Sequence, residues 1–143
     1  MDTTALGNLG ETRVLYEFVK NGVQCFIPHG DGCSIDLIAL FSNKLNRIQI
    51  KTCEHLNSAG AMEWKVTRQK GYHGTRTTYN VEDIDYFAFY CKENDVVCLV
   101  PFTKDFPTTT FSIRPDDYSG TRTKTMRFAS DYAVEKIING SMV

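Results

Sequence analysis

The chain has 143 residues, of which 42% are hydrophobic and 23% are charged, and its formal net charge at pH 7 is −1. We expect this length to form one domain, residues 1–143, with enough hydrophobic residues for a packed core rather than a disordered chain. The nearly neutral charge gives no global electrostatic reason to expect a nucleic-acid partner, although basic residues can still gather locally. No stretch reaches membrane-spanning length and the N-terminus has no hydrophobic signal core, so we expect no membrane partner and a cytoplasmic or nucleoid-associated location.

The five cysteines are an odd number and include no Cys-x-x-Cys pair. Without a sign of secretion, they are expected to be free and mostly buried thiols in a reducing compartment. Cys25, His29 and Cys33 raise the alternative of a zinc site. The last two lie in a glycine-rich turn, however, and no fourth ligand follows at a suitable spacing, so we favour free thiols.

The first expected element is a helix over residues 9–20, followed by the stop signal Asn21-Gly22. Hydrophobic residues recur along one side of this helix, namely Val14, Leu15, Phe18 and Val19. Further segments have the composition of strands bounded by turn residues. These strands are expected at residues 23–28, 34–41, 47–53 and 62–67, with turns at 29–32 and 42–46 and a polar loop at 68–80.

The second half of the chain predicts a hairpin, an edge strand and a closing helix. The hairpin covers residues 85–101 around a turn at 92–95, and the edge strand covers 109–114. The helix covers 130–139 and ends at Asn139-Gly140. Its expected inward residues are Ala133, Val134, Ile137 and Ile138. The order of helix, strands and helix predicts an α/β fold, with a central mixed sheet flanked by helices.

Polar side chains interrupt two of the expected strands. Asp36 lies in the strand at 34–41, and Gln49 and Lys51 lie in the strand at 47–53. Because side chains alternate along a strand, Gln49 and Lys51 share one face and lie roughly 7 Å apart. A buried carboxylate or ammonium group needs compensation, which an ion pair or a metal ion can provide.

Glu11 precedes the first hydrophobic residues of the expected helix by about one turn, so it is expected to point toward the sheet. If the two interrupted strands pair, Asp36 and Glu11 converge with Gln49 and Lys51, and oxygen ligands of this kind suit Mg²⁺. Two simpler interpretations stay open. In the first, Glu11, which follows Asn8 at capping-box spacing, caps the helix. In the second, Asp36 pairs with Lys51 in a structural ion pair.

At this point the sequence resembles the PD-(D/E)XK nucleases. The segments "GNLGETRVLYEFVKNG", "SIDLIAL" and "IQIKT" resemble the N-terminal helix, the metal-binding aspartate strand and the (D/E/Q)-x-K strand of that family. The resemblance covers about residues 5–115, including the "DIDYFAFYCKENDVVCLVP" hairpin. It is closest to the small intron-encoded homing endonucleases on this fold, and the archaeal-type Holliday junction resolvases are similar as well.

The resemblance implies the PD-(D/E)XK fold and metal-dependent hydrolysis of DNA phosphodiester bonds, leaving 5′-phosphate and 3′-hydroxyl ends. It implies Mg²⁺ as cofactor, with Mn²⁺ as a substitute, held by Asp36, Glu11, Gln49 and the backbone carbonyl of Ile50. Lys51 would position the attacking water or stabilise the transition state. The commoner family pattern has Asp or Glu where this chain has Gln49, which leaves an inactive descendant as an alternative.

The favoured interpretation is a site-specific intron-encoded homing endonuclease acting on double-stranded DNA. A Holliday junction resolvase or a restriction-type nuclease is the first alternative, and a catalytically inactive DNA-binding module is the second. Because one small chain cuts one strand per site, double-strand cleavage implies a homo-oligomer, a dimer or a tetramer.

Basic side chains are concentrated in two segments that contain no acidic residue, residues 64–79 and 118–130. Tyrosine and threonine alternate with the basic residues in both segments, a composition that suits contacts to phosphates and to a DNA groove. Solvated charged loops are the alternative interpretation. The predicted DNA-binding residues are Lys65, Arg68, Lys70, Arg76, Arg122, Lys124 and Arg127.

Overall fold

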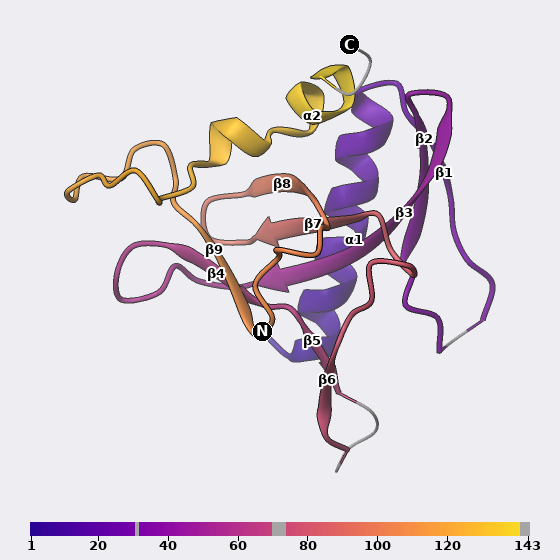
Figure 1. Cartoon of the computed structure of the whole chain (residues 1–143), viewed down its shortest axis with the longest axis horizontal. Coiled ribbons are helices and arrows are strands. Elements are labelled where there is room, and N and C mark those ends of the chain that lie inside the picture. The colour runs from indigo at the N-terminus through magenta and orange to yellow at the C-terminus, as the bar shows by residue number, and fades with distance from the viewer. Residues whose placement is uncertain (31, 70–73, 141–143) are drawn as a thin grey trace.

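A computed structural model describes residues 1–30, 32–69 and 74–140 of the chain. At its centre lies a five-stranded sheet with the strand order β1-β2-β3-β7-β8 (Figure 1). Its strands are β1 Gln24–Phe26, β2 Leu37–Phe41, β3 Lys44–Cys53, β7 Tyr86–Cys91 and β8 Val96–Pro101. β3 and β7 are parallel and the other neighbouring strands are antiparallel, so the sheet is mixed, as the sequence predicts.

Helices and small ribbons complete the fold. Helix α1, Thr3–Lys20, lies across one face of the sheet, and a 3₁₀ helix at Ala129–Tyr132 leads into α2, Val134–Gly140 (Figure 1). The ribbons pair β4 Met62–Lys65 with β9 Thr110–Ile113, and β5 Thr67–Gln69 with β6 Arg76–Thr78. No helix in the described ranges has both the length and the hydrophobicity that crossing a membrane requires.

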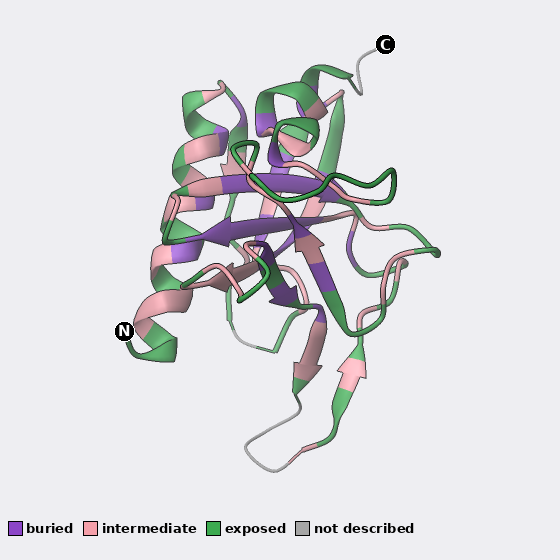
Figure 2. Cartoon of the chain, turned by 90° about the vertical axis from the view of Figure 1, so that its left-hand side faces the viewer, coloured by how far each residue is buried: buried purple, intermediate pink, exposed green. Residues whose placement is uncertain are grey.

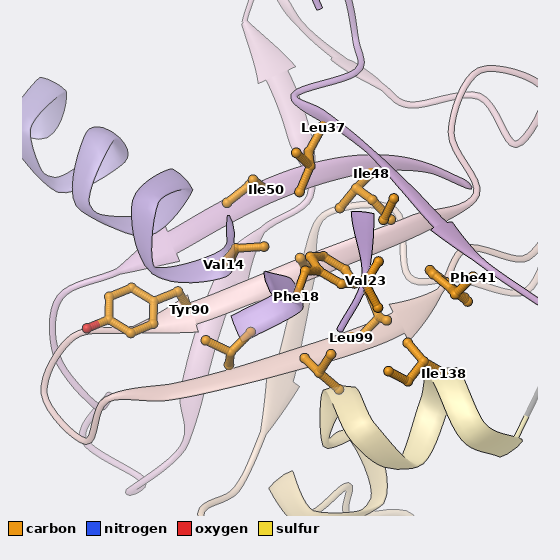
Figure 3. Close-up of a cluster of buried hydrophobic side chains, with 14 residues drawn as sticks. Val14, Phe18, Val23, Leu37, Phe41, Ile48, Ile50, Tyr90, Leu99 and Ile138 are labelled. Atoms are coloured by element: carbon orange, nitrogen blue, oxygen red, sulfur yellow. The ribbon is translucent and has the colours of Figure 1, made fainter. Parts of the chain in front are cut away.

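The sheet buries side chains on both of its faces. On one face, residues of α1, α2 and the strands pack together, among them Phe18, Ile48 and Leu99 (Figure 3). On the other face, Trp64 of β4 and Phe111 of β9 both stack against Phe89 of β7. β7 and β8 are accordingly buried along most of their length, whereas the β5–β6 ribbon is exposed or half-buried (Figure 2). Strands covered on both faces have the nearly continuous hydrophobic sequence seen at residues 86–91.

Helix α1 begins six residues before the position that the sequence pattern predicts. Asp2 is the N-cap, and its carboxylate accepts hydrogen bonds from Thr4 N at 2.7 Å and Ala5 N at 3.2 Å. Asn8 therefore lies inside the helix, and the capping-box interpretation of Glu11 is wrong. The predicted stop is confirmed, because Asn21 is the C-cap and Gly22 has a φ of +77°.

The β2–β3 hairpin has a tighter turn than expected. Ser42 and Asn43 have φ angles of 56° and 57°, so a two-residue turn replaces the expected turn at 42–46, and β3 begins at Lys44. The buried Asn46 stabilises this turn by donating to three backbone carbonyls, those of Ala39, Phe41 and Lys44. β2 begins only at residue 37, so the expectation that Asp36 lies within a strand is wrong by one residue.

The segment around residues 62–80 differs most from the expectation. The single strand expected at 62–67 is divided into β4 and β5, which belong to different ribbons. The polar loop expected at 68–80 contains β6, paired antiparallel with β5. The hairpin at 85–101 and the strand near 109–114 are confirmed within a few residues. The helix expected at 130–139 is divided into the 3₁₀ helix Ala129–Tyr132 and α2, which begins at Val134.

Candidate active site

The candidate active site lies where β2 and β3 separate. Their ladder ends at the pair Leu37 and Ile48, and the Asp36 N–H donates to the Ile48 carbonyl at 2.9 Å. The Ile50 N–H, next in line on β3, donates instead to Oδ2 of Asp36 at 2.9 Å. The carboxylate thus takes the place of a strand carbonyl at the fork, and this hydrogen bond fixes its orientation.

Gln49 and Lys51 lie on the face of β3 opposite to Ile48 and Ile50, as strand alternation requires. Gln49 is only 7% exposed, and its Nε2 donates to the Ser34 carbonyl at 2.6 Å. Its Oε1 accepts a hydrogen bond from the Tyr79 hydroxyl at 3.2 Å.

The Lys51 ammonium group is held close to the β5–β6 ribbon. Its Nζ donates to the Thr67 carbonyl at 3.2 Å and lies 4.8 Å from the centre of the Tyr79 ring. This ammonium does not form a salt bridge with Asp36 in the described part of the chain. The interpretation of these two residues as a direct structural ion pair is therefore wrong.

Glu11 approaches the site from α1, on the other side of the sheet. The preceding residue, Gly10, is buried so tightly against β3 that a Cβ atom there would overlap the side chain of Thr52. This close contact brings the exposed Glu11 to the fork, where it lines two cavities together with Asp36, of about 250 Å³ and 180 Å³. The Glu11 carboxylate forms no hydrogen bond or ion pair with another described residue, so it is available for a ligand.

The electrostatics of the site favour a bound cation. Burial raises the pKa of Asp36 to about 6, and the nearby Glu11 raises it further, while the Ile50 N–H and Lys51 oppose the shift. Burial also lowers the pKa of Lys51 to about 8, against the effect of Asp36 and with a contribution from Arg76 and Arg68. A positive ion between the two carboxylates would relieve their mutual repulsion.

The donor chemistry fits a hard divalent cation. Asp36 and Glu11 provide carboxylate oxygens that line the same two cavities. The Ile50 carbonyl and the Gln49 amide are the further oxygen donors that the sequence predicts. In the described residues, no group of three or more His, Cys, Asp or Glu side chains is placed to hold a metal. Mg²⁺ suits such a site, because it binds through one or two carboxylates and retains water and phosphate oxygens as further ligands.

A larger cavity of about 510 Å³ adjoins the fork on the side of the ribbons. Glu11 and Lys51 line it together with Lys65 and Arg76, two of the predicted DNA-binding residues. A third, Arg68, donates from Nη1 to Ser34 Oγ at 2.7 Å, so it lies beside the carbonyl that holds Gln49. Lys70 lies outside the described residues.

The second basic segment lies elsewhere. In Figure 1 the loop around residues 118–127 lies at the left, away from the β5–β6 ribbon at the bottom, and Arg127 lies over the ring of Phe111 in β9. Arg122 Nη2 donates to the carbonyls of Asp116 and Tyr118 in its own loop. The structure therefore brings Lys65, Arg68 and Arg76 to the candidate site and leaves this second segment apart.

Sequence reasoning missed Tyr79, Ser34 and Thr67, which contact the predicted site residues directly. Ser34 and Thr67 contact Gln49 and Lys51 through their backbone carbonyls, which carry no residue-type signal. Tyr79 stood in a segment interpreted as a polar loop, although a tyrosine directly before the hydrophobic strands suggests a partly buried position.

The β2–β3 fork of this α/β fold carries two carboxylates, those of Asp36 and Glu11. The Gln-x-Lys segment of β3 lies beside them, and basic side chains of the ribbons line the cavity. Together these features define a nuclease-type site. The chain belongs to the PD-(D/E)XK endonuclease family, whose sequence profile matches residues 1–135. No curated protein matches the sequence. A similar solved structure is the bacterial homing endonuclease I-Ssp6803I, which is 18% identical and has a TM-score of 0.73. The alignment covers 98% of this chain and 95% of that one, and shows a shared fold.

Proposed function

We propose that this protein is a Mg²⁺-dependent endonuclease that hydrolyses phosphodiester bonds in double-stranded DNA. The observation that carries the proposal is the position of Asp36, whose carboxylate replaces a strand carbonyl at the β2–β3 fork beside Glu11 and Lys51. Membership of the PD-(D/E)XK endonuclease family supports the same chemistry.

Each site residue has a separate task in this proposal. Asp36 and Glu11, with the Ile50 carbonyl, would hold the cation, and a cation bound there would supply charge stabilisation of the phosphate and lower the pKa of a bound water. Mn²⁺ has the same preference for oxygen ligands and is expected to substitute. Lys51 stabilises the negative charge that develops in the transition state. Because one lone pair of Gln49 Oε1 accepts the Tyr79 hydroxyl, only the other lone pair would be left for a cation.

The proposed biological role is a site-specific homing endonuclease that acts as a homo-oligomer, either a dimer or a tetramer, inside the cell. The shared fold with a bacterial homing endonuclease over nearly the whole of both chains supports this role over that of a junction resolvase or a restriction-type nuclease. Comparing cleavage of a four-way junction with that of duplexes selected from a random DNA library distinguishes these roles. Preferential cleavage of junctions without sequence preference would contradict the homing role.

The catalytic proposal is tested by plasmid nicking with Mg²⁺, with Mn²⁺ and with a chelator. Nicking that depends on the metal and disappears in Asp36→Asn supports it, provided that the variant still binds DNA. Metal-independent nicking, or equal nicking by the variant, would overturn the assignment of the site.

An inactive DNA-binding module is the second candidate, and one observation favours it. Both polar atoms of the Gln49 amide are already hydrogen-bonded, one to Ser34 and one to Tyr79, as expected of a side chain with a structural task. DNA binding without nicking in either metal would establish this candidate instead.

A further inference from the structure

One aromatic side chain, that of Tyr79, contacts two residues of the candidate site at once. Tyr79 follows β6 directly and connects the basic ribbon to the central sheet. Its hydroxyl donates to Gln49 Oε1 at 3.2 Å, and the Lys51 ammonium lies 4.8 Å from the centre of its ring. A single side chain thus touches both polar residues of the Gln-x-Lys strand.

Tyr79 is itself held in place by the hydrophobic core. Its ring packs edge-on against Phe87 of β7 at 5.4 Å between ring centres. The half-buried ring therefore has little freedom to rotate, and its face stays directed at Lys51. The Thr67 carbonyl also accepts from Lys51 Nζ at 3.2 Å. The first residue of β5 and the residue after β6 therefore both contact the ammonium group.

We propose that Tyr79 is a positioning residue of the nuclease site, whose ring orients the Lys51 ammonium and whose hydroxyl orients the Gln49 amide. This inference rests on the proposed function for its catalytic consequence. A lysine side chain has four rotatable bonds. If the ammonium group is already held in place before the reaction, the loss of side-chain entropy does not add to the activation free energy. Because the aromatic ring carries no net charge, the ammonium group keeps its positive charge available for an anion. A carboxylate partner would neutralise that charge.

Two substitutions separate the tasks of the ring and the hydroxyl. Tyr79→Phe keeps the ring under Lys51 and removes only the hydrogen bond to Gln49, so we expect single-turnover cleavage to fall by about tenfold or less, the value of one neutral hydrogen bond. Tyr79→Leu removes the ring as well, so we expect a loss of roughly a hundredfold or more, as one misplaced electrostatic contact causes. The Kd for DNA measured without metal should change less than threefold in both variants.

Tyr16→Leu is the matched control, because Tyr16 is a 58% exposed tyrosine on α1 outside the site. Its cleavage rate and DNA affinity should equal those of the parent. If both Tyr79 variants cleave at the parental rate while the parent is active, the positioning proposal is wrong and the nuclease assignment stands. A loss of DNA affinity equal to the loss of rate would also overturn it, since it would place Tyr79 in binding instead.

A readout independent of catalysis comes from nuclear magnetic resonance of the side chains. The Lys51 εCH₂ protons should show an upfield ring-current shift in the parent and in Tyr79→Phe, and lose it in Tyr79→Leu. The Gln49 side-chain amide resonances should move already in Tyr79→Phe. If no nicking occurs in any protein, the nuclease proposal fails, and these shifts alone decide whether the tyrosine holds the two side chains. Unshifted lysine protons in the parent would refute the contact.

Discussion

At the scale of single residues, the candidate site places a carboxylate where it lowers stability in the absence of a cation. Burial and the neighbouring Glu11 raise the pKa of Asp36 to about 6, above the value of 3.8 for an unperturbed aspartate. The folded state therefore binds this proton more tightly than the unfolded state, and the associated stability is present below pH 3.8 and lost as pH rises through about 6. Such a cost is typical of functional sites.

Asp36→Asn is expected to stabilise the metal-free protein while it abolishes cleavage. At pH 8, in chelator, the variant should gain roughly 1–2 kcal/mol in free energy of unfolding, after allowance for the partial exposure of the group. The gain should shrink as pH falls toward 4, because the parent carboxyl group is then protonated as well. Added Mg²⁺ should stabilise the parent and not the variant, because only the parent has the full ligand set. Thermal melts across pH check all three points.

Asp85→Asn is the contrasting control for this prediction. Hydrogen bonds from the Arg47 side chain lower the pKa of Asp85, so this carboxylate contributes stability at neutral pH that is lost as pH falls. Its removal should lower the melting temperature. If Asp36→Asn lowers the stability at pH 8, the interpretation that the ionised Asp36 carboxylate destabilises the metal-free protein is contradicted.

Lys51→Met is expected to fold nearly normally, to bind DNA and to lose cleavage by orders of magnitude. Burial lowers the pKa of Lys51 to about 8, which shows that the folded state disfavours the ammonium form. Methionine has a similar shape without a charge, so its effect on stability at pH 7 should stay within about 1 kcal/mol. Melts and nicking assays on the same preparation test both statements, with the exposed Lys92→Met as control. A variant that nicks DNA at the parental rate would remove Lys51 from the mechanism.

At the scale of elements, the position of Glu11 depends on how closely α1 approaches β3. Gly10→Ala would place a methyl group against Thr52, so we expect a loss of about 1–3 kcal/mol in stability and a reduced cleavage rate as the helix moves away. Gly7→Ala, one turn earlier, has no atom within 4 Å of the added Cβ and should gain up to about 1 kcal/mol from helix propensity. Denaturant melts of the two variants should therefore shift in opposite directions. Equal shifts would mean that the contact does not constrain the helix.

The β5–β6 ribbon is the element expected to meet the DNA backbone. Arg76 lines the large cavity, and its Nε and Nη1 donate within the ribbon to Thr67 Oγ1 and Gln69 Oε1. If it contacts one phosphate, Arg76→Ala should weaken binding and lower the slope of log K against log salt by about 0.9. Arg122→Ala tests the second basic segment in the same titration. If the salt dependence of DNA binding by Arg76→Ala has the same slope as that of the parent, the ribbon is not the DNA-binding surface.

The elements that sequence reasoning found are those whose signals are local. The hairpin at 85–101 alternates hydrophobic strands with a polar turn, and its position is confirmed. The start of α1 was missed, because its first turns are exposed and lack a hydrophobic period, and the signal is a single cap at Asp2. β6 was missed since three polar residues pair with β5 through backbone hydrogen bonds that any residue can form.

The site itself was only partly predictable for the same reason. The grouping of Asp36, Gln49 and Lys51 followed from strand alternation and from the family resemblance. The contacts that orient them come from residues 15 to 30 positions away, such as the Ser34 carbonyl and the Tyr79 hydroxyl. Such long-range contacts depend on the path of the ribbon, which no local pattern specifies.

At the scale of the whole molecule, one chain provides one candidate site for one strand of DNA. The acidic fork, Lys51 and the cavity all belong to a single region between α1, β3 and the ribbons, and Lys65 and Arg76 of the first basic segment line the same cavity. Cutting both strands of a duplex therefore needs two copies of the chain, or two successive visits by one copy. In these two routes, the amount of linear DNA product depends differently on the fraction of active subunits.

Mixing the parent with Asp36→Asn before adding supercoiled plasmid distinguishes the routes. If two subunits act together in an oligomer, linear product should fall with the square of the active fraction, while nicked product accumulates. A monomer acting twice would give linear product in proportion to its own concentration, with the inactive variant only competing for DNA. Light scattering of the free protein and of its DNA complex gives the number of subunits present. A linear dependence together with a monomeric complex would contradict the proposed homo-oligomer and leave the chain as a nicking enzyme.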